Sequence, residues 1–411
     1  MMDRLGPFEP RPRVAVAVSG GADSLAAAVL TRNWVRPRGG DVVGLVVDHG
    51  LRRESADEAL LTCARLQRAG IASVALTLTD LARGPGIAAR ARTARHAVLE
   101  QACAERGILH LVFGHHAADQ AETVTMRMLA GSTPIGLAGM AALSETAAIR
   151  RLRPLLGVPP TALRAVLRAE GLDWIEDPSN ADPSQQRARL RLLRGDPAGI
   201  GSATRALVRA SAARGATRAA AEAAWAAELA ARVTLYPQGY ALLSPGPIAP
   251  EALACLLATL SGAERPPPMK QVAPLAAAPR PATLAGVQVL PAGRLGDGFL
   301  LVREAAATAP PIPAMVGKLW DGRFRLRSLP AGSEGLTLGA WGAEAPRDRK
   351  GLPAAVQRSL PVLRRCNEVV GRSADLFDGT NPHMVFNPHF TLAGARFFPL
   401  LPVCGWDQDE N

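Results

Sequence analysis

The chain has 411 residues, 48% of them hydrophobic, which is enough for two or three domains of roughly 150 residues each. Its 47 basic and 36 acidic residues leave a net charge of +11, which favours nucleic acid or another anionic partner. No apolar run reaches the ~18 residues of a membrane span, the N-terminus lacks an apolar signal core, and the five scattered cysteines argue against zinc or iron–sulfur sites. We therefore expect a soluble cytoplasmic protein.

The first 195 residues alternate between strand-like and helix-like segments. Short runs rich in β-branched residues predict buried parallel strands at 13–19, 41–49, 72–78 and 108–114. Helices are predicted between them, at 24–33, 55–69 and 88–106. This rhythm predicts a doubly wound α/β domain over residues 1–195, with ligands bound at the carboxyl ends of a parallel sheet.

The composition changes after about residue 196. Alanine with scattered arginine dominates 202–232 and predicts one or two helices, and proline-rich stretches follow at 244–250, 265–270 and 278–282. Two short runs, 286–290 and 298–302, predict a hairpin, and 308–314 predicts a linker. We therefore divide the remainder into a helical or mixed middle domain, 196–310, and a small α+β C-terminal domain, 311–411.

The turn Ser19-Gly20-Gly21-Ala22-Asp23-Ser24 joins the first strand to the first helix. It lacks the lysine of a Walker A loop and the spacing of a dinucleotide loop. A tight turn capped by Ser19 or Asp23 is one explanation. The other is the pyrophosphate loop of the ATP pyrophosphatase group, with its signature S-G-G-x-D-S. In that group the N–H groups of Gly20, Gly21 and Ala22 would hold the β- and γ-phosphates of ATP, the two serines would add hydrogen bonds, and Asp23 would hold Mg²⁺.

Further motifs narrow the resemblance. They are, in chain order, VDHGLRRESADEA (47–59), ARTARH (91–96), GHHAADQAETVTMRMLAGSTPIGLAGM (114–140), RLRPLL (151–156) and LDWIEDPSNADPSQQRARLR (172–191). On these residues the chain resembles the tRNA(Ile)-lysidine synthetase family, and AAVQRSLPVL (354–363) is more weakly similar to the family's C-terminal domain. The resemblance implies an ATP pyrophosphatase domain followed by tRNA-binding domains.

The same resemblance implies a ligase that forms a C–N bond in two steps. ATP would adenylate O2 of the wobble cytidine in a tRNA(Ile) with a CAU anticodon. Free lysine would then attack C2 and displace AMP, leaving lysidine.

Other candidate ligand residues lie at a strand end and on a helix face. Asp48 and His49 end the second strand and are predicted to contact ATP, although His49 is equally well explained as a turn cap. Arg92 and Arg95 lie three residues apart on one helix face and are predicted to bind a phosphate of ATP or RNA, although a solvated face would look the same.

His116 and Asp119 are predicted to act with Asp23 in catalysis. Asp119 is expected to bind Mg²⁺ together with Asp23, or to orient the lysine amine, against the simpler role of an acid at a helix start. The ε-amine of lysine has an ordinary pKa of about 10.4 and must lose a proton before it attacks. Asp119 is the first candidate for that base, and His116 is the alternative.

Arg187, Arg191 and Arg194 recur at i, i+4 and i+7 and therefore predict one basic stripe for the tRNA backbone. Three other positions depart from the family pattern: Ala118 stands for the first of two acids, His96 for an aromatic residue and Ala188 for an asparagine. These departures bear on the metal ligands and on an RNA contact near residue 188.

Two other functions fit parts of this pattern. A tRNA thiolase also uses a pyrophosphate loop, but such enzymes commonly carry paired catalytic cysteines or a cluster, and the chain has no cysteine pair near its motifs. A non-catalytic RNA-binding protein on a decayed nucleotide fold is expected to lose Ser19, Gly20 or Asp23 first. The sequence indicates no oligomeric state.

Overall fold

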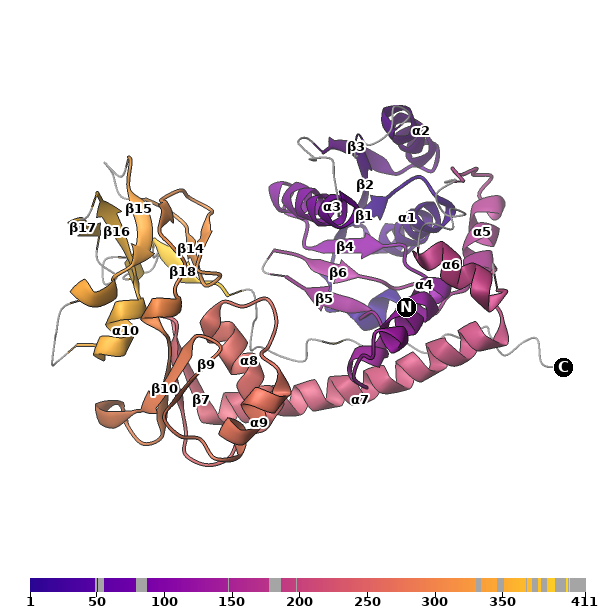
Figure 1. The fold of residues 1–411 in the computed structure, drawn as a ribbon. Helices are drawn as coiled ribbons and strands as arrows, with labels where there is room; N and C mark the ends of the chain where they lie inside the picture. The colour runs from indigo at the N-terminus through magenta and orange to yellow at the C-terminus, as the bar shows by residue number, and fades with distance from the viewer. Residues whose placement is uncertain are drawn as a thin grey trace. The chain divides into compact units, whose positions relative to one another are not determined.

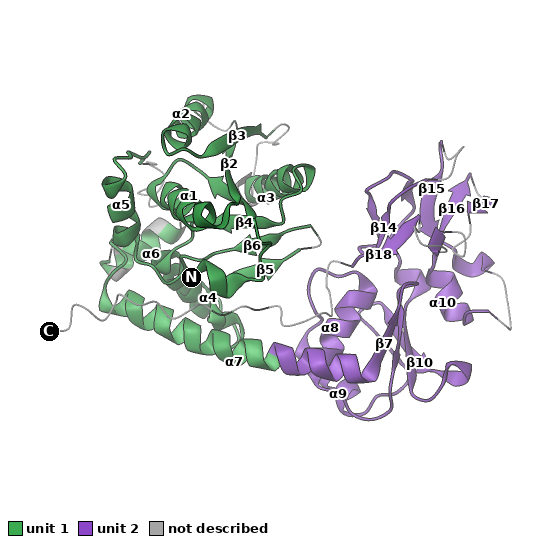
Figure 2. Ribbon diagram, turned by 180° about the vertical axis from the view of Figure 1, so that it is seen from behind, with its two compact units in different colours: residues 1–221, 395–411 green, residues 222–394 purple. Residues whose placement is uncertain are grey.

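The computed structural model describes residues 1–48, 50, 55–78, 87–146, 148–176, 186–196, 198–329, 334–345, 351–366, 368–371, 376–377, 383–388, 397 and 399. The chain forms two compact units, residues 1–221 with 395–411, and residues 222–394 (Figure 2). Their division falls within one long helix, α7 (Ser202–Arg232). The division into three domains at 195 and 310 stays a prediction.

A six-stranded sheet forms the centre of the first unit, in the order β3-β2-β1-β4-β6-β5 (Figure 1). Neighbouring strands run parallel except for β5 and β6, which pair antiparallel at one edge. The strands are β1 (Arg13–Val18), β2 (Asp41–Asp48), β3 (Ala72–Thr77), β4 (His110–Phe113), β5 (Leu143–Glu145) and β6 (Arg150–Leu152). The predicted α/β fold with a parallel sheet is thus confirmed, and the strand order reverses between β1 and β4, where such folds bind ligands.

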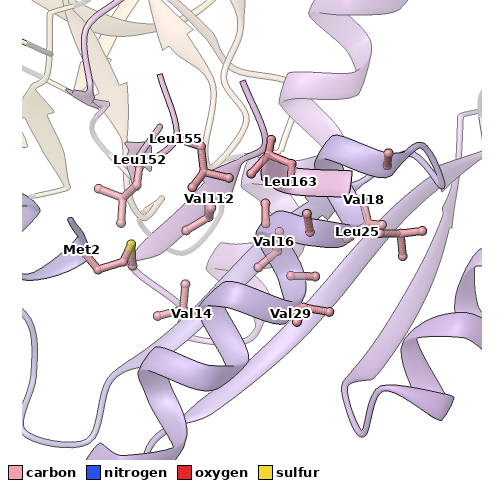
Figure 3. Packing of buried hydrophobic residues seen from close by; sticks show 14 of the residues in the cluster. Met2, Val14, Val16, Val18, Leu25, Val29, Val112, Leu152, Leu155 and Leu163 are labelled. Atoms are coloured by element: carbon pink, nitrogen blue, oxygen red, sulfur yellow. The ribbon is translucent and has the colours of Figure 1, made fainter. Parts of the chain in front are cut away.

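Helices cover both faces of this sheet. They are α1 (Ala22–Val35), α2 (Ser55–Arg68), α3 (Ile87–Glu105), α4 (Ala117–Leu129), α5 (Pro160–Ala169), α6 (Gln186–Arg194) and α7. The period of two along β1 explains the layers: Val14, Val16 and Val18 pack with α1 and α5 in one apolar cluster (Figure 3). Ala15 and Ala17 face the opposite side, in the cluster that contains Leu99 and Cys103 of α3. Because helices cover both faces of the sheet, side chains on both sides of β1 are apolar, and its sequence is an almost continuous apolar run.

The described residues of the second unit form three antiparallel sheets. Its five-stranded sheet has the order β7-β8-β11-β10-β9 and packs with helices α8 (Pro250–Ser261) and α9 (Met269–Ala277). Its strands are β7 (Val233–Tyr236), β8 (Tyr240–Leu243), β9 (Ala282–Leu284), β10 (Val287–Pro291) and β11 (Phe299–Arg303). The hairpin predicted from 286–290 and 298–302 is therefore confirmed as β10 and β11.

The remaining strands form a four-stranded sheet, β12-β15-β16-β17, and a three-stranded sheet, β13-β14-β18. They are β12 (Ile312–Pro313), β13 (Leu319–Trp320), β14 (Phe324–Leu326), β15 (Thr337–Ala340), β16 (Pro361–Arg365), β17 (Glu368–Gly371) and β18 (Met384–Phe386), with helix α10 (Ala354–Ser359). The predicted linker 308–314 thus contains a short edge strand, since Ile312 and Pro313 pair with β15 and an edge position tolerates proline.

Among the residues that the structure describes, no helix is long and apolar enough to cross a lipid bilayer.

Candidate active site

The turn after β1 leaves the first N–H groups of α1 without a side-chain cap. Gly21 is the N-cap residue, and no side chain caps the helix there. The Ser19 N–H donates to Ser24 Oγ (3.1 Å), and Ser24 Oγ donates to the Gly21 carbonyl (3.0 Å). Gly20 has φ +87°, and a Cβ there would come within 2.5 Å of Thr62 Oγ1. The turn therefore requires glycine at position 20 and presents a helix N-terminus that suits an anion.

The turn opens into a cavity of about 350 Å³ at the carboxyl ends of the central strands. Ser19, Gly21, Asp23 and Ser24 line one part of it. The other lining residues come from β2, from the end of β4, from α2 and α3, and from the segment after α5; they include Leu45, Val46, Val47, Thr62, Arg95, Leu99, Phe113, Gly114, His115 and Ile175. A polar end that offers N–H groups and an apolar end beside it suit a nucleotide with its phosphates.

Close packing fixes the start of α1 beside the end of β4. A Cβ on Gly114 would lie 2.7 Å from the Asp23 carbonyl oxygen and 2.9 Å from Ser24 Cα. On the other side, the Ile175 N–H donates to the Gly20 carbonyl (3.0 Å), and Ile175 itself lines the cavity. The sequence prediction did not single out Ile175, although it lies in the quoted motif LDWIEDPSN.

His116 lies between two carboxylates that are distant in sequence. Its Nε2 is 3.3 Å from Asp23 Oδ2 and 3.5 Å from Asp119 Oδ2. The Asp119 carboxylate also accepts the backbone N–H of His116 (3.0 Å), which caps the start of α4, since His116 is the N-cap residue of that helix. His116 and Asp119 are buried, whereas the Asp23 side chain is 39% exposed. The three predicted catalytic residues are therefore adjacent in space.

The pKa values of the two histidines after β4 are shifted in opposite directions. Burial alone would lower the pKa of His116, but Asp119, Asp23 and Glu122 outweigh it, and the pKa is raised above its ordinary value. Burial likewise favours a raised pKa for Asp119, but the neighbouring histidines and the backbone bond lower it. The pKa of His115 is lowered to about 3, mainly by burial and against the opposing charge of Asp119. The surroundings thus favour the imidazolium form of His116 and the carboxylate form of Asp119, and they keep His115 a neutral imidazole at neutral pH.

The predicted basic stripe on α6 faces carboxylates of α4. Arg191 Nε lies 2.5 Å from Oε1 of Glu122, which is fully buried, and Glu122 Oε2 has no hydrogen-bond partner among the described residues. Arg187 Nη1 lies 3.8 Å from Asp119 Oδ1, and the Arg194 side chain is outside the described residues. Glu122 is thus a buried acid beside the site to which the sequence analysis assigned no role.

Several predicted ligand residues lie apart from the cavity wall. Asp48 accepts the Gly50 N–H (2.9 Å) and a hydrogen bond from Ser55, so it organises the turn after β2. Arg95 lines the cavity, but Arg92 is not among its lining residues. Ala118 is buried, and a Cβ on Gly199 would lie 2.6 Å from its Cβ. His49, the DPSN segment and the Ala188 side chain are outside the described residues.

The donor set suits a magnesium ion shared with phosphates. Among the described residues, no group of three or more His, Cys, Asp and Glu side chains is arranged to hold a metal. Asp23 Oδ1 is buried and has no hydrogen-bond partner among the described residues. Asp119 Oδ2 lies near the Asp23 carboxylate, since both carboxylates contact His116 Nε2. Mg²⁺ is usually held by one or two carboxylates together with substrate phosphates.

The fold and the site define an ATP-using protein of the pyrophosphate-loop class. A family described as a PP-loop domain matches residues 2–194. A curated tRNA(Ile)-lysidine synthase from Bradyrhizobium is 40% identical over 46% of this chain and 53% of its own length. The tRNA(Ile)-lysidine synthase of Mesorhizobium japonicum is 34% identical over 92% of this chain and 90% of its own length. The chain therefore belongs to the tRNA(Ile)-lysidine synthase family.

The similarity covers only part of some relatives. The chain spans about half the length of the Bradyrhizobium relative (53%) and of two other curated relatives that it matches (56% and 50%). Among solved structures, a U34-tRNA thiolase from Methanococcus maripaludis with its [4Fe-4S] cluster is similar at a TM-score of 0.41 and 19% identity, over 51% of this chain and 75% of the thiolase.

Proposed function

We propose that this chain ligates lysine to C2 of the wobble cytidine in a tRNA(Ile) with a CAU anticodon. In the first step, O2 of the cytidine attacks the α-phosphorus of ATP, the bond to the β-phosphate oxygen breaks, and pyrophosphate leaves. In the second step, the ε-nitrogen of lysine attacks C2, the C2–O2 bond breaks, and AMP leaves. The observation that carries this proposal is His116 held between Asp23 and Asp119 at the phosphate loop of a chain from this family.

ATP is placed with its phosphates at the start of α1. The N–H groups of Gly20, Gly21 and Ala22 and the hydroxyls of Ser19 and Ser24 are the proposed phosphate donors. Support comes from the uncapped helix N-terminus and from the cavity that Ser19, Gly21 and Ser24 line. Arg95, which lines the same cavity, supplies a cation for ATP. Asp48 and His49 stay candidates for the nucleoside part at the end of β2.

Asp23 and Asp119 are the proposed magnesium ligands, together with phosphate oxygens of ATP. When bound there, the ion would offset the negative charge that develops on the departing pyrophosphate. The carboxylates raise the pKa of His116 and so favour its imidazolium form at the same place. In that form His116 is suited to stabilising a phosphate oxygen when the cytidine is adenylated.

The base for the second step is Asp119, with His116 as the alternative. The pKa of Asp119 is lowered, so its carboxylate is ionised throughout the range in which lysine is added. The pKa of His116 is raised, so His116 accepts a proton only above that pKa. The two assignments differ in their pH profiles. If Asp119 is the base, the pH profile of His116→Asn should match that of the wild type. If His116 is the base, wild-type activity should rise with pH as His116 loses its proton, and His116→Asn should lack that rise.

The proposed tRNA contact on α6 includes Arg187, Arg191 and Arg194. Support comes from the net charge of +11 and from the family. Arg187 is the best placed of the described pair, because its side chain is 39% exposed whereas Arg191 is held by buried Glu122. We place this reaction in the cytoplasm, where ATP, lysine and tRNA are all present.

The test is incubation of the protein with labelled lysine, ATP, Mg²⁺ and a tRNA transcript that carries a CAU anticodon. The expected result is label in one nucleoside, lysidine, with AMP and pyrophosphate released in equal amounts. A transcript with a CAC anticodon serves as the control, because it lacks the target context. Release of ADP and phosphate, sulfur incorporation, or lysine esterified at the 3′ end would each overturn the proposal.

A further inference from the structure

Four arginines gather beside the candidate active site, where α3 meets β6. Arg92 and Arg95 belong to α3, and Arg151 and Arg153 lie in β6 and directly after it. The Arg153 guanidinium is 5.7 Å from the ring centre of Phe113. The rings of His115 (5.8 Å) and His96 (5.3 Å) also lie against Phe113, so the arginine cluster adjoins the end of β4. We use "arginine cluster" for Arg92, Arg95, Arg151 and Arg153.

The arginine cluster contains more positive charge than its neighbours neutralise. Glu100 forms an ion pair with Arg151, while Arg153 donates to the Ala141 carbonyl (3.0 Å) and to Ser144 Oγ (3.2 Å). Neither Arg92 nor Arg95 forms a hydrogen bond or ion pair with another described side chain. The Nε atoms of Arg95, Arg151 and Arg153 are buried without a hydrogen-bond partner in the described part of the chain.

Burial and the crowding of positive charge lower the pKa values of the arginine cluster and of the neighbouring His96. Burial first, and then the charges of the neighbouring arginines, lowers the pKa of all four guanidinium groups, that of Arg153 to about 10. The same causes lower the pKa of His96 to about 4. Buried cations that serve only the fold are normally paired with carboxylates. An excess of partly desolvated guanidinium groups is instead typical of a site for a phosphate, which binds the planar fork in a bidentate manner.

The arginine cluster lies next to the ATP cavity, and only part of it belongs to that cavity. Arg95, Phe113 and His115 line the cavity, whereas Arg92, Arg151 and Arg153 are not among its lining residues. The phosphate loop already offers N–H groups and hydroxyls for the polyphosphate of ATP. A second anion site that borders the reacting groups fits the other polyanion of the proposed reaction, which is RNA.

We propose that Arg92, Arg151 and Arg153 bind a backbone phosphodiester of the tRNA next to the reacting cytidine, while Arg95 faces ATP. This inference rests on the proposed function. It assigns Arg92 to RNA, one of the two ligands, ATP and RNA, that the sequence analysis predicts for it. Arg92 is exposed and Arg153 is partly buried, so Arg92 is the member that contacts an incoming strand first. Arg187, whose charge lowers the pKa of Arg92, extends the same positive region toward α6.

The first test compares tRNA binding with ATP binding in Arg92→Gln. Arg168→Gln is the matched control, because Arg168 is an exposed arginine on α5, which packs with α1 in the apolar cluster on the other face of the sheet. Filter binding of the CAU transcript at several KCl concentrations should show about tenfold weaker binding for Arg92→Gln at low salt, with the salt slope reduced by about 0.7–0.9 for one lost phosphate contact. ATP affinity, measured by equilibrium dialysis, should stay unchanged, and Arg92→Lys should restore the slope.

The second test locates the contact on the RNA. Synthetic anticodon stem-loops carry one uncharged methylphosphonate at each loop position in turn. Wild-type protein should lose affinity at the phosphates that flank the wobble cytidine, and Arg92→Gln should be insensitive at one of these positions. An unchanged salt slope with weakened ATP binding, or no position at which the variant is less sensitive than wild type, overturns the inference. Failure of the wild type to ligate lysine overturns the proposed function instead. In that case the binding data still test whether Arg92 contacts the RNA backbone.

Discussion

Replacing Gly21 with alanine separates ligand binding from folding at the phosphate loop. Gly21 has φ −73° and ψ 162°, which alanine adopts without strain. An added Cβ would meet nothing closer than the Ile175 carbonyl oxygen and Ser19 Oγ, both 3.9 Å away. Alanine is a poorer N-cap residue than glycine, but it also restricts the unfolded chain. Because these effects oppose each other, we expect the free energy of unfolding to change by less than about 1 kcal/mol.

The same methyl group blocks the approach of a phosphate. Gly21 lines the cavity directly before α1, and a phosphate oxygen must come within about 2.9 Å of a backbone nitrogen to accept its hydrogen bond. Losing one well-placed donor to a developing charge lowers the rate of an enzyme by about 10²–10³-fold. We therefore expect Gly21→Ala to raise the KM for ATP and to lower turnover by about 10²-fold or more.

Urea unfolding, ATP binding and pyrophosphate release measure the two effects separately. Gly20→Ala is the contrasting variant: its φ of +87° and the 2.5 Å approach to Thr62 Oγ1 predict lost stability as well as lost activity. Gly21→Ala protein that keeps both ATP affinity and turnover within about threefold of wild type would refute the phosphate cradle. Protein that loses stability as Gly20→Ala does would refute the claim that position 21 is sterically free.

Asp23→Asn should slow pyrophosphate release by about 10²–10³-fold with little change in Tm, and a loss of less than tenfold would contradict its proposed role. Arg191→Gln should lower the free energy of unfolding by about 1–3 kcal/mol in urea, because it leaves buried Glu122 unpaired, whereas Arg187→Gln should mainly flatten the salt dependence of tRNA binding. Because the pKa of His116 is raised, the stability that its imidazolium contributes is complete below the unfolded value of about 6.5 and is lost as pH rises through the folded pKa. The Tm difference between wild type and His116→Asn should therefore shrink in alkali, and a difference that stays constant from pH 6 to 10 would contradict it.

The sequence predicts the phosphate loop and the central strands because their signals are local. Gly20, Gly21 and Ser24 lie within one turn, and β1 and β2 are long apolar runs whose period and composition are visible in the chain. β5 and β6 were not predicted, since each has three residues and β6 begins with two arginines. Their strand character comes from pairing with each other and with β4, which no local pattern records.

Local sequence patterns do not show which groups the site residues contact in the fold. Helical spacing correctly places Arg187 and Arg191 on one face of α6, but what that face meets depends on tertiary packing. Asp23 and Asp119 were each proposed as metal ligands, yet their common contact with His116 joins two segments that are more than 90 residues apart. A stripe of arginines looks the same in the sequence whether it faces RNA, solvent or a buried carboxylate. Here Arg191 is paired closely with fully buried Glu122, whereas Arg187 lies 3.8 Å from Asp119.

Helix α4 explains how the candidate catalytic side chains are held in place. Asp119 at its start bonds the His116 N–H, and Glu122 one turn later pairs with Arg191 of α6. Between them, fully buried Gln120 accepts the Met140 N–H (2.8 Å) and donates toward the Met140 carbonyl (3.2 Å) and Ser211 Oγ on α7 (3.4 Å). Each of these polar groups would be costly to leave unpaired when buried. The helix is thus fixed in rotation by three different segments, so that the rigidity of α4 itself brings Asp119 to His116, which also contacts Asp23.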